Sequence, residues 1–262
     1  MLEKYLPRLT FDSYEDFYQN FKINVPENFN FAFDVVDATA ETRPDKPAMV
    51  WCDDQGHEAR FSFQQMRQYS NKAANVFRSL GIRKGDAVML ILKRRYEFWF
   101  CLLGLHKIGA VGIPATHLLT SKDIAYRNNS ADIKMIVTVN EEGICHEIET
   151  AVEKSPSLKL KAVVGGSRPG WIDMDAALAE ASDAFQRPTG DQAVCNDDIL
   201  MLYFTSGTTG MPKMVQLNHT YPLGHILTAK YWQNVSDNGL HLTVADTGWA
   251  KAAWGKIYGQ WL

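Results

Sequence analysis

The chain is poor in cysteine and contains no Cys-x-x-Cys pair. Its four cysteines stand tens of residues apart, at Cys52, Cys101, Cys145 and Cys195. Since no paired cysteine or histidine spacing completes a ligand set, we expect no metal site among them. The pattern instead predicts reduced, mostly buried thiols in a cytoplasmic protein.

Long hydrophobic runs and basic tracts are also missing. The longest apolar stretch, Phe98 to Leu105, is far shorter than the ~20 residues that cross a bilayer, so we expect no membrane span. Met1 to Lys4 leads into polar sequence without the apolar core of a signal peptide. The formal net charge is −3, and Lys93 to Arg95 is the densest basic cluster. This distribution argues against a nucleic-acid partner.

What the sequence does contain is an alternation of apolar runs and amphipathic segments, which predicts an α/β fold of mainly parallel sheets flanked by helices. A capping box, Ser62 to Gln65, opens the clearest amphipathic helix. We expect strands at 48–52, 58–62, 87–92, 110–114, 133–139, 158–164, 199–204, 214–217 and 240–244. Helices are predicted at 14–21, 31–42, 63–80, 97–108, 121–128, 141–154, 174–185, 219–235 and 249–262.

The chain divides into two parts by composition. Residues 1–30 are expected to form an amino-terminal arm, and residues 31–262 a larger body with a possible joint in the polar stretch 187–196. Residues 254–262 are largely apolar, with no charged residue or proline after them. Because such a ridge would be left exposed, we expect the chain to be a piece of a longer protein.

One loop has the composition of a phosphate-binding site. The apolar run Ile199 to Phe204 leads into Thr205, Ser206, Gly207, Thr208, Thr209 and Gly210, and then to Lys213. The two glycines permit positive φ, so that backbone N–H groups can converge beside hydroxyl donors and one cation. A plain solvated loop is the alternative. The order differs from G-x-x-x-x-G-K-[ST], since Pro212 precedes Lys213 and Met214 follows it.

This ordered stretch, Thr205 to Lys213, resembles the phosphate-loop signature of the adenylate-forming superfamily. Residues 61–63, 81–86 and 105–114 are similar to the amino-terminal half of acyl-CoA synthetases, and Asp246 to Gly255 is similar to their medium-chain branch. The resemblance implies an incomplete amino-terminal part of the large adenylation domain, without the small carboxyl-terminal domain.

The resemblance also implies a reaction and its residues. A carboxylic acid, medium-chain or branched, would attack ATP to give acyl-AMP, and CoA would then displace AMP. Thr205 to Gly210 would wrap the β- and γ-phosphates, and Lys213 would be catalytic by neutralising the departing pyrophosphate. Trp249, Lys251 and Trp254 would border the acyl pocket, or else form helix core plus a solvated lysine. We assign His219 no acid–base role.

Several parts of the superfamily pattern are absent from the 262 residues. No Tyr-x-x-Thr-Glu stretch follows the loop, so the glutamate that would hold Mg²⁺ is expected outside this chain. We therefore expect the 262 residues to bind ATP weakly and to turn nothing over. Two other functions stay open: an adenylation domain that loads a carrier-protein thiol, and a non-catalytic nucleotide-binding module. The sequence does not define an oligomeric state.

Overall fold

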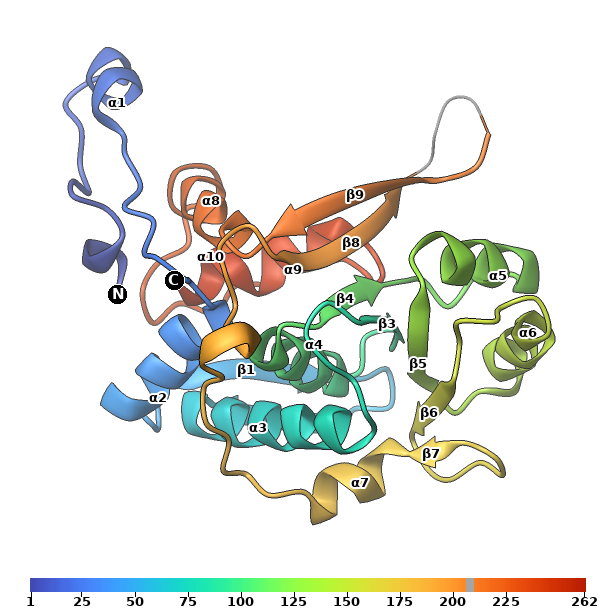
Figure 1. The fold of residues 1–262 in the computed structure, drawn as a ribbon. Coiled ribbons are helices and arrows are strands. Elements are labelled where there is room, and N and C mark those ends of the chain that lie inside the picture. Colours follow the sequence, from blue (N-terminus) through green and yellow to red (C-terminus); the bar gives the residue numbers. More distant parts are fainter. Residues whose placement is uncertain (206–209) are drawn as a thin grey trace.

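The fold was analysed in a computed structural model that describes residues 1–205 and 210–262. Its centre is a seven-stranded sheet, and a separate two-stranded hairpin lies beside it (Figure 1). The hairpin is β1 (Pro47–Cys52) and β2 (Glu58–Ser62). The sheet comprises β3 (Ala87–Ile91), β4 (Val111–Pro114), β5 (Ile133–Val139), β6 (Leu160–Val164), β7 (Ile172–Asp173), β8 (Ile199–Thr205) and β9 (Lys213–Asn218).

The strand order of the large sheet is β7-β6-β5-β3-β4-β8-β9, with every neighbouring pair parallel except β8 and β9. The chain runs from β3 to β4 on one side, and then crosses to β5 on the other side of β3. The connections after β3 and β5 leave in opposite directions, so the carboxyl ends of β3 and β5 form the topological switch point of the sheet, where open α/β sheets bind their ligands. The predicted α/β class with a mainly parallel sheet is confirmed.

Helices cover both faces of the sheet. The α-helices are α1 (Tyr14–Asn20), α2 (Ala38–Thr42), α3 (Phe63–Ser79), α4 (Glu97–Ile108), α5 (Ser121–Ser130), α6 (Glu142–Val152), α7 (Met174–Glu180), α8 (Tyr221–Leu227), α9 (Ala250–Lys256) and α10 (Tyr258–Trp261). Figure 1 shows α3 and α4 on one side of the parallel strands and α5 and α6 on the other. No helix within the described residues is both long and apolar enough to cross a membrane.

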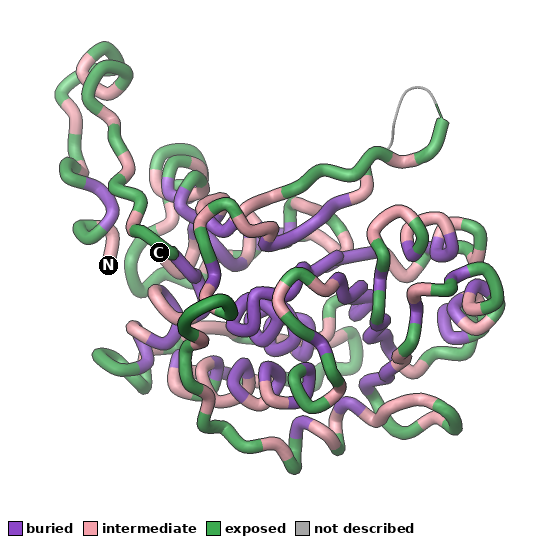
Figure 2. Tube along the Cα trace, in the orientation of Figure 1, coloured by how far each residue is buried: buried purple, intermediate pink, exposed green. Residues whose placement is uncertain are grey.

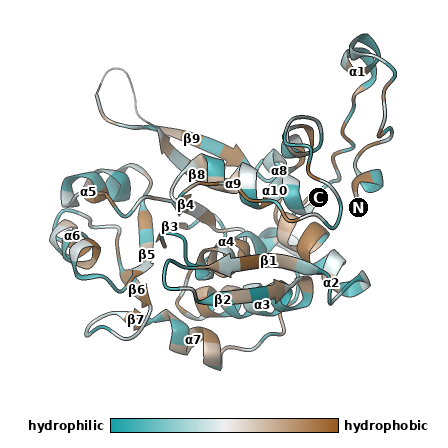
Figure 3. Ribbon diagram, turned by 180° about the vertical axis from the view of Figure 1, so that it is seen from behind, coloured by the Kyte–Doolittle hydropathy of each residue, from teal (hydrophilic) through white to brown (hydrophobic). Residues whose placement is uncertain are grey.

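The helix that joins β3 to β4 is the most deeply buried one. Every residue of α4 is buried, because α3 packs on one side of it and the sheet on the other. Gly104 permits this close packing, since a Cβ there would lie 2.7 Å from the Cβ of Ala73 on α3. Gly109 ends the helix with φ of 71°, a conformation that glycine adopts without strain. Figure 3 shows hydrophobic colour on the inner strands β5 and β6 and hydrophilic colour over much of α5.

The amino-terminal segment extends away from the sheet and is mostly exposed along its outer turn (Figure 2). It returns to the body through an aromatic cluster, in which Phe11, Phe17 and Phe21 surround Tyr231 at ring-centroid distances between 5.0 and 6.3 Å. The Tyr231 hydroxyl also donates to the backbone oxygen of Leu9 at 3.2 Å. These contacts place the arm against the segment that follows α8.

The predictions for the carboxyl-terminal third are less accurate. The strand predicted at 240–244 is wrong: the structure gives these residues no strand pairing, and Leu240, Leu242 and Val244 are each more than 80% exposed. The helix predicted at 219–235 starts later, as α8, and continues as a π-helical segment over Thr228–Trp232. The helix predicted at 249–262 is divided at Ile257, whose φ of −122° and ψ of −73° are not helical.

The prediction for the cysteines is right for two of the four. Cys101 and Cys145 are buried, but Cys52 and Cys195 are exposed, and all four are free thiols. Cys52 is the last residue of β1, in a two-stranded sheet whose outer positions face solvent. Strand edges of this kind leave alternate side chains outside, which a count of scattered cysteines does not reveal.

Candidate functional site

The predicted phosphate loop connects β8 to β9 at one edge of the sheet. In the antiparallel register of these strands, Thr205 pairs with Lys213. Ser206, Gly207, Thr208 and Thr209 lie outside the described residues. Gly210 follows them with φ of 130°, in a region that side chains other than glycine rarely adopt. The structure thus places Thr205 and Lys213 opposite each other where the loop leaves the sheet.

The sequence of the two strands explains this position. β8 is buried over Leu200 to Tyr203 and pairs with β4, whereas β9 is the edge strand and its first four residues are exposed. A buried strand fixes the start of the loop, while the exposed edge leaves Lys213 in contact with solvent. Lys213 can therefore keep its charge without the cost of burial.

Helix α5 supports the base of this hairpin. The Tyr126 hydroxyl donates to the backbone oxygen of Pro212 at 2.9 Å, and its ring meets that of Phe204 with centroids 6.2 Å apart. The Arg127 guanidinium lies 5.1 Å from the centroid of the Phe204 ring. Burial lowers the pKa of Arg127, but a guanidinium remains charged in proteins. The hairpin thus carries two cations near its open end, Arg127 against Phe204 of β8 and Lys213 at the start of β9.

The segment 246–248 docks against the carboxyl ends of β3 and β4. The Thr247 hydroxyl donates to the backbone oxygen of Lys93, just after β3. Gly248 lies so close to the chain after β4 that a Cβ would stand 2.4 Å from the carbonyl carbon of Ala115 and the nitrogen of Thr116. The Thr247 side chain and the close approach of Gly248 to the backbone together position the start of α9.

The three residues predicted to border an acyl pocket are only partly brought together. Trp249 is 65% exposed, and Lys251 is exposed as well. Trp254 is half-buried and stacks on His225 of α8, with centroids 6.2 Å apart and the rings inclined by 18°. It also meets Trp232, at a centroid distance of 5.7 Å. Trp254 is therefore the member of the predicted set that joins α9 to α8.

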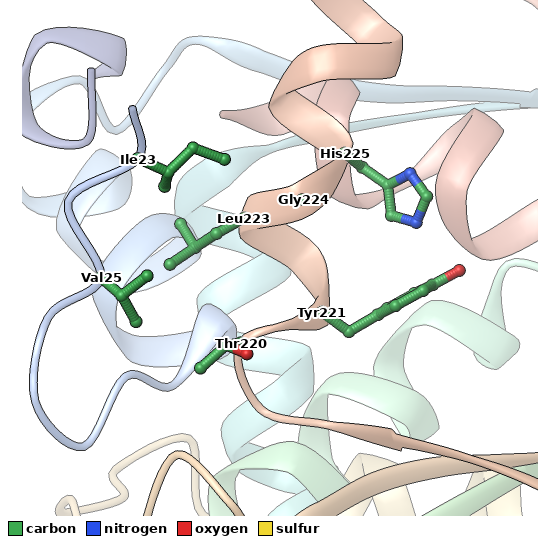
Figure 4. Close-up of a pocket in the computed structure, with 7 residues that line it drawn as sticks. All are labelled: Ile23, Val25, Thr220, Tyr221, Leu223, Gly224 and His225. Atoms are coloured by element: carbon green, nitrogen blue, oxygen red, sulfur yellow. The ribbon is translucent and has the colours of Figure 1, made fainter. Parts of the chain in front are cut away.

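An open pocket of about 450 Å³ adjoins this contact (Figure 4). Its lining combines two residues of the arm with the start of α8: Ile23, Val25, Thr220, Tyr221, Leu223, Gly224 and His225. Figure 4 shows Ile23, Val25 and Leu223 on one side of Gly224, with Tyr221 and His225 on the other. A second hollow of about 370 Å³ shares Tyr221 with it and reaches Asp197 and Gln216.

The titratable groups of this pocket are uncharged at neutral pH. Burial lowers the pKa of His225 to about 4 and raises the pKa of Tyr221 to about 12. No charged side chain is part of the pocket lining in the described residues. The pocket lining is therefore better suited to an apolar ligand than to an ion.

Two further histidines lie below α8. The rings of His106 and His219 are fully buried with centroids 6.3 Å apart, and neither ring nitrogen of His219 has a hydrogen-bond partner among the described residues. Burial lowers the pKa of His219 to about 4 and the pKa of His106 well below its usual value. Both rings are therefore neutral at physiological pH.

The sequence prediction missed much of this arrangement. Nothing in the sequence marks Ile23 and Val25 as pocket residues, because they stand about 200 positions before α8 and carry no periodic signal. The sequence likewise did not predict a role for Tyr126 and Arg127, because the hairpin residues that they contact are 77 or more positions away in the chain. His225 was included only as part of a longer predicted helix.

The described residues provide no cluster of metal-binding side chains. They contain no group of three or more histidine, cysteine, aspartate or glutamate side chains arranged to hold a metal ion.

The mainly parallel sheet with helices on both faces defines an α/β protein, and comparison with known proteins identifies its family. The model of the AMP-binding enzyme family matches residues 36–259. The chain belongs to this family.

Among curated relatives, acyl-coenzyme A synthetase ACSM3 of Mus musculus is 35% identical over 259 residues, which cover 96% of this chain and 44% of the relative. Acyl-coenzyme A synthetase ACSM4 of Mus musculus is 36% identical over 247 residues, or 91% of this chain and 41% of the relative. Both names carry the word mitochondrial. The chain thus spans less than half the length of the curated relatives that it matches.

Solved structures show the same fold. The Brucella canis acyl-CoA synthetase superposes with a TM-score of 0.76 at 23% identity, covering 88% of this chain and 41% of that one. The anthranilate CoA ligase AuaEII, solved with anthranoyl-AMP, also gives a TM-score of 0.76 at 23% identity, covering 90% and 44%. The predicted fold, part of an acyl-CoA synthetase-like large domain, is confirmed.

Proposed function

We propose that this chain is part of an ATP-dependent acyl-CoA synthetase that activates a medium-chain or branched fatty acid. The observation that carries the proposal is the pairing of Thr205 with Lys213 at the exit of a hydroxyl-rich loop, in a chain of the AMP-binding family. The names of the relatives, which are acyl-coenzyme A synthetases, support the same reaction class.

In the first step, a carboxylate oxygen of the acid bonds to the α-phosphorus of ATP, and the bond from that phosphorus to pyrophosphate breaks. Thr205 to Gly210 hold the β- and γ-phosphates through hydroxyl and backbone N–H donors. Lys213 then faces the growing charge on the pyrophosphate. Since this charge is greatest in the transition state, a cation fixed at the loop exit accelerates the step.

In the second step, the CoA sulfur, having released its proton, attacks the acyl carbonyl and AMP leaves with the electron pair of the broken bond. Trp254 borders the acyl group from α9, with Trp249 and Lys251 completing that wall. The stacking of Trp254 on His225 supports this placement for Trp254. Trp249 and Lys251 are exposed, so further residues must pack over them before they can border an enclosed acyl pocket.

We further propose that residues 1–262 alone bind ATP weakly and turn nothing over. The absence of a metal-binding cluster in the described residues and the short coverage of the relatives support this. We also propose that the protein is cytoplasmic. Within the chain, we propose that residues 31–262 form one body with a joint near residues 187–196. Cell fractionation tests the location, since the relatives are named as mitochondrial.

The deciding experiment measures carboxylate-dependent exchange of pyrophosphate into ATP by a chain that extends over the length of the relatives. We expect exchange with octanoate and octanoyl-CoA formation once CoA is added. Supplying a phosphopantetheine carrier protein in place of CoA separates this enzyme from a carrier-loading adenylation domain. Absence of exchange with every carboxylate would overturn the proposal, and the 262-residue chain provides the inactive control.

A further inference from the structure

One side chain of α5 contacts both strands of the β8–β9 hairpin at its open end (Figure 1). The Tyr126 hydroxyl donates to the backbone oxygen of Pro212 at 2.9 Å, and Pro212 directly precedes Lys213. The Tyr126 ring meets the ring of Phe204, which directly precedes Thr205, with centroids 6.2 Å apart. Tyr126 therefore touches the chain neighbour of each residue in the Thr205–Lys213 pair.

The hydrogen bond to Pro212 orients the peptide unit that carries Lys213. Because a peptide unit is planar, the Pro212 carbonyl and the Lys213 N–H turn together. Pro212 has no N–H of its own to donate, so its carbonyl is the backbone group through which it can be anchored. Among the described residues, no other side chain donates a hydrogen bond to the segment 210–217. Tyr126 thus restrains the chain at the point where it enters β9.

This end of the hairpin has little packing of its own. The first four residues of β9 are exposed, because β9 is the edge strand of the sheet. On the other strand, Phe204 is half-buried and Thr205 is exposed. Strand ends with few buried contacts open locally at a low cost in free energy. The contacts from α5 are therefore the ones that can hold Lys213 in register with Thr205.

Helix α5 is itself held at both ends. Thr120 and Asp123 form a capping box at its start. Near its other end, the Asn128 amide donates to the Ser155 hydroxyl at 2.9 Å, which ties α5 to the chain after α6. A side chain that positions a reacting group acts best from a rigid element. Tyr126 is presented from such an element.

We propose that Tyr126 is a positioning residue for the adenylation step, which holds Lys213 in place through the Pro212 carbonyl and the Phe204 ring. The inference rests on the proposed function, because it takes Lys213 as the cation that faces the departing pyrophosphate. Tyr126 touches neither the nucleotide nor the acid in this role. A cation stabilises a transition state fully only when it is already in position, so a looser hairpin end lowers kcat.

The first test removes the Tyr126 hydroxyl and keeps the ring. In a chain of the relatives' full length, Tyr126→Phe should lower kcat for carboxylate-dependent pyrophosphate exchange by about fivefold to tenfold, the equivalent of one hydrogen bond. The KM for ATP should stay within about twofold of wild type, since the loss falls on the transition state. Tyr126→Leu also removes the contact with Phe204 and should lower kcat by roughly a further fivefold.

The matched control is Tyr231→Phe. The Tyr231 hydroxyl also donates to a backbone oxygen, that of Leu9 at 3.2 Å, but it does so at the amino-terminal arm. This variant should leave kcat and KM unchanged. A wild-type kcat in Tyr126→Phe would overturn the inference.

A double variant separates the positioning of Lys213 from a general loosening of the fold. If Tyr126 acts through Lys213, then Tyr126→Phe should change the residual exchange rate less than about twofold in a Lys213→Ala chain. An equal loss in the Lys213→Ala chain and in the wild-type chain would show that Tyr126 supports the fold alone. That result would overturn the inference.

Hydrogen exchange follows the hairpin without reference to activity. Deuterium uptake by peptides that cover residues 211–218 should be faster in Tyr126→Phe than in wild type, and unchanged in Tyr231→Phe. Equal uptake in Tyr126→Phe and wild type would mean that the hydroxyl does not hold the strand, and the inference would be wrong.

The proposed function and this inference can fail separately. Faster uptake in Tyr126→Phe, in a wild-type chain without any pyrophosphate exchange, would keep the contact but reject the synthetase and the catalytic part of the inference. Exchange activity with the same kcat in Tyr126→Phe and wild type would keep the synthetase and reject the positioning role.

Discussion

Lys107 Nζ lies 2.8 Å from Oδ1 and 2.9 Å from Oδ2 of Asp37, and both side chains are buried. The same ammonium group donates to Oδ1 of Asn71. These residues come from α4, from the π-helical segment Ala32–Asp37 and from α3. Burial lowers the pKa of Lys107 to about 8, and the Asp37 carboxylate acts in the opposite direction. The ion pair fixes how the start of the body packs on the central helices.

Asp37→Ala should reduce the free energy of unfolding by about 3–5 kcal/mol, because it leaves the Lys107 ammonium buried without its counter-charge. Urea denaturation monitored by circular dichroism measures this. The matched control is Glu58→Ala, which removes an exposed pair with Arg60 at 3.7 Å and should cost less than about 1 kcal/mol. A loss below about 1 kcal/mol for Asp37→Ala would show that the buried pair has little effect on stability.

The sequence predicted the central α/β units well, because local signals and burial agree there. Residues 97–108 and 133–139 were predicted with the observed bounds of α4 and β5. Ser62 and Gln65 form the predicted capping box, with reciprocal bonds of 3.3 and 2.9 Å. In contrast, alternation at 240–244 predicted a strand, but a strand also needs a partner, and the described residues supply none there.

The candidate site was predictable only where its residues are contiguous. Ile199 to Phe204 and Lys213 are close in sequence, so their strands and the loop between them could be located from composition and glycine placement. The positions of the pocket residues Ile23 and Val25 depend on tertiary contacts of the amino-terminal arm, including the hydrogen bond from Asn196 to Pro26. Such a contact leaves no periodic pattern in the chain. The roles of Thr205 to Gly210, Lys213 and Trp254 stay predictions.

Stability should fall as the pH is lowered from 6.5 toward 4, because His219 is neutral in the folded protein. Its pKa is lowered to about 4 by burial, with Asp198 raising it and Lys84 and Arg187 lowering it. Between these values the unfolded chain binds more protons, so protonation favours unfolding. From pH 7 to pH 5, His219 alone should account for about 2 kcal/mol of the loss.

His219→Gln tests this assignment. The quantity compared is the change in the free energy of unfolding between pH 7 and pH 5, and not the free energy at either pH alone. Urea denaturation at pH 7 and pH 5 should show a smaller loss in the variant by about 2 kcal/mol. His146→Gln, at an exposed position of α6, is the matched substitution away from the buried histidines. An identical pH dependence in His219→Gln and wild type would refute the assignment.

Gly248→Ala should destabilise the protein by about 1–3 kcal/mol, since the new Cβ would overlap the backbone of Ala115 and Thr116. Thermal unfolding followed by circular dichroism measures the change. Gly143→Ala is the control, because a Cβ there meets nothing within 4 Å and alanine favours a helix. An unchanged melting temperature for Gly248→Ala would mean that the segment 246–248 does not dock on the strand ends as described.

Lys213→Ala should lower carboxylate-dependent pyrophosphate exchange by about a hundredfold or more in a chain of the relatives' full length. The reason is that Lys213, which pairs with Thr205 in the strand register, is proposed to stabilise charge that grows on pyrophosphate in the transition state. Its effect should therefore fall mainly on kcat and only weakly on the KM for ATP. Lys154→Ala, an exposed lysine near the end of α6, should leave both constants unchanged. Wild-type exchange in Lys213→Ala would remove the catalytic role of this lysine.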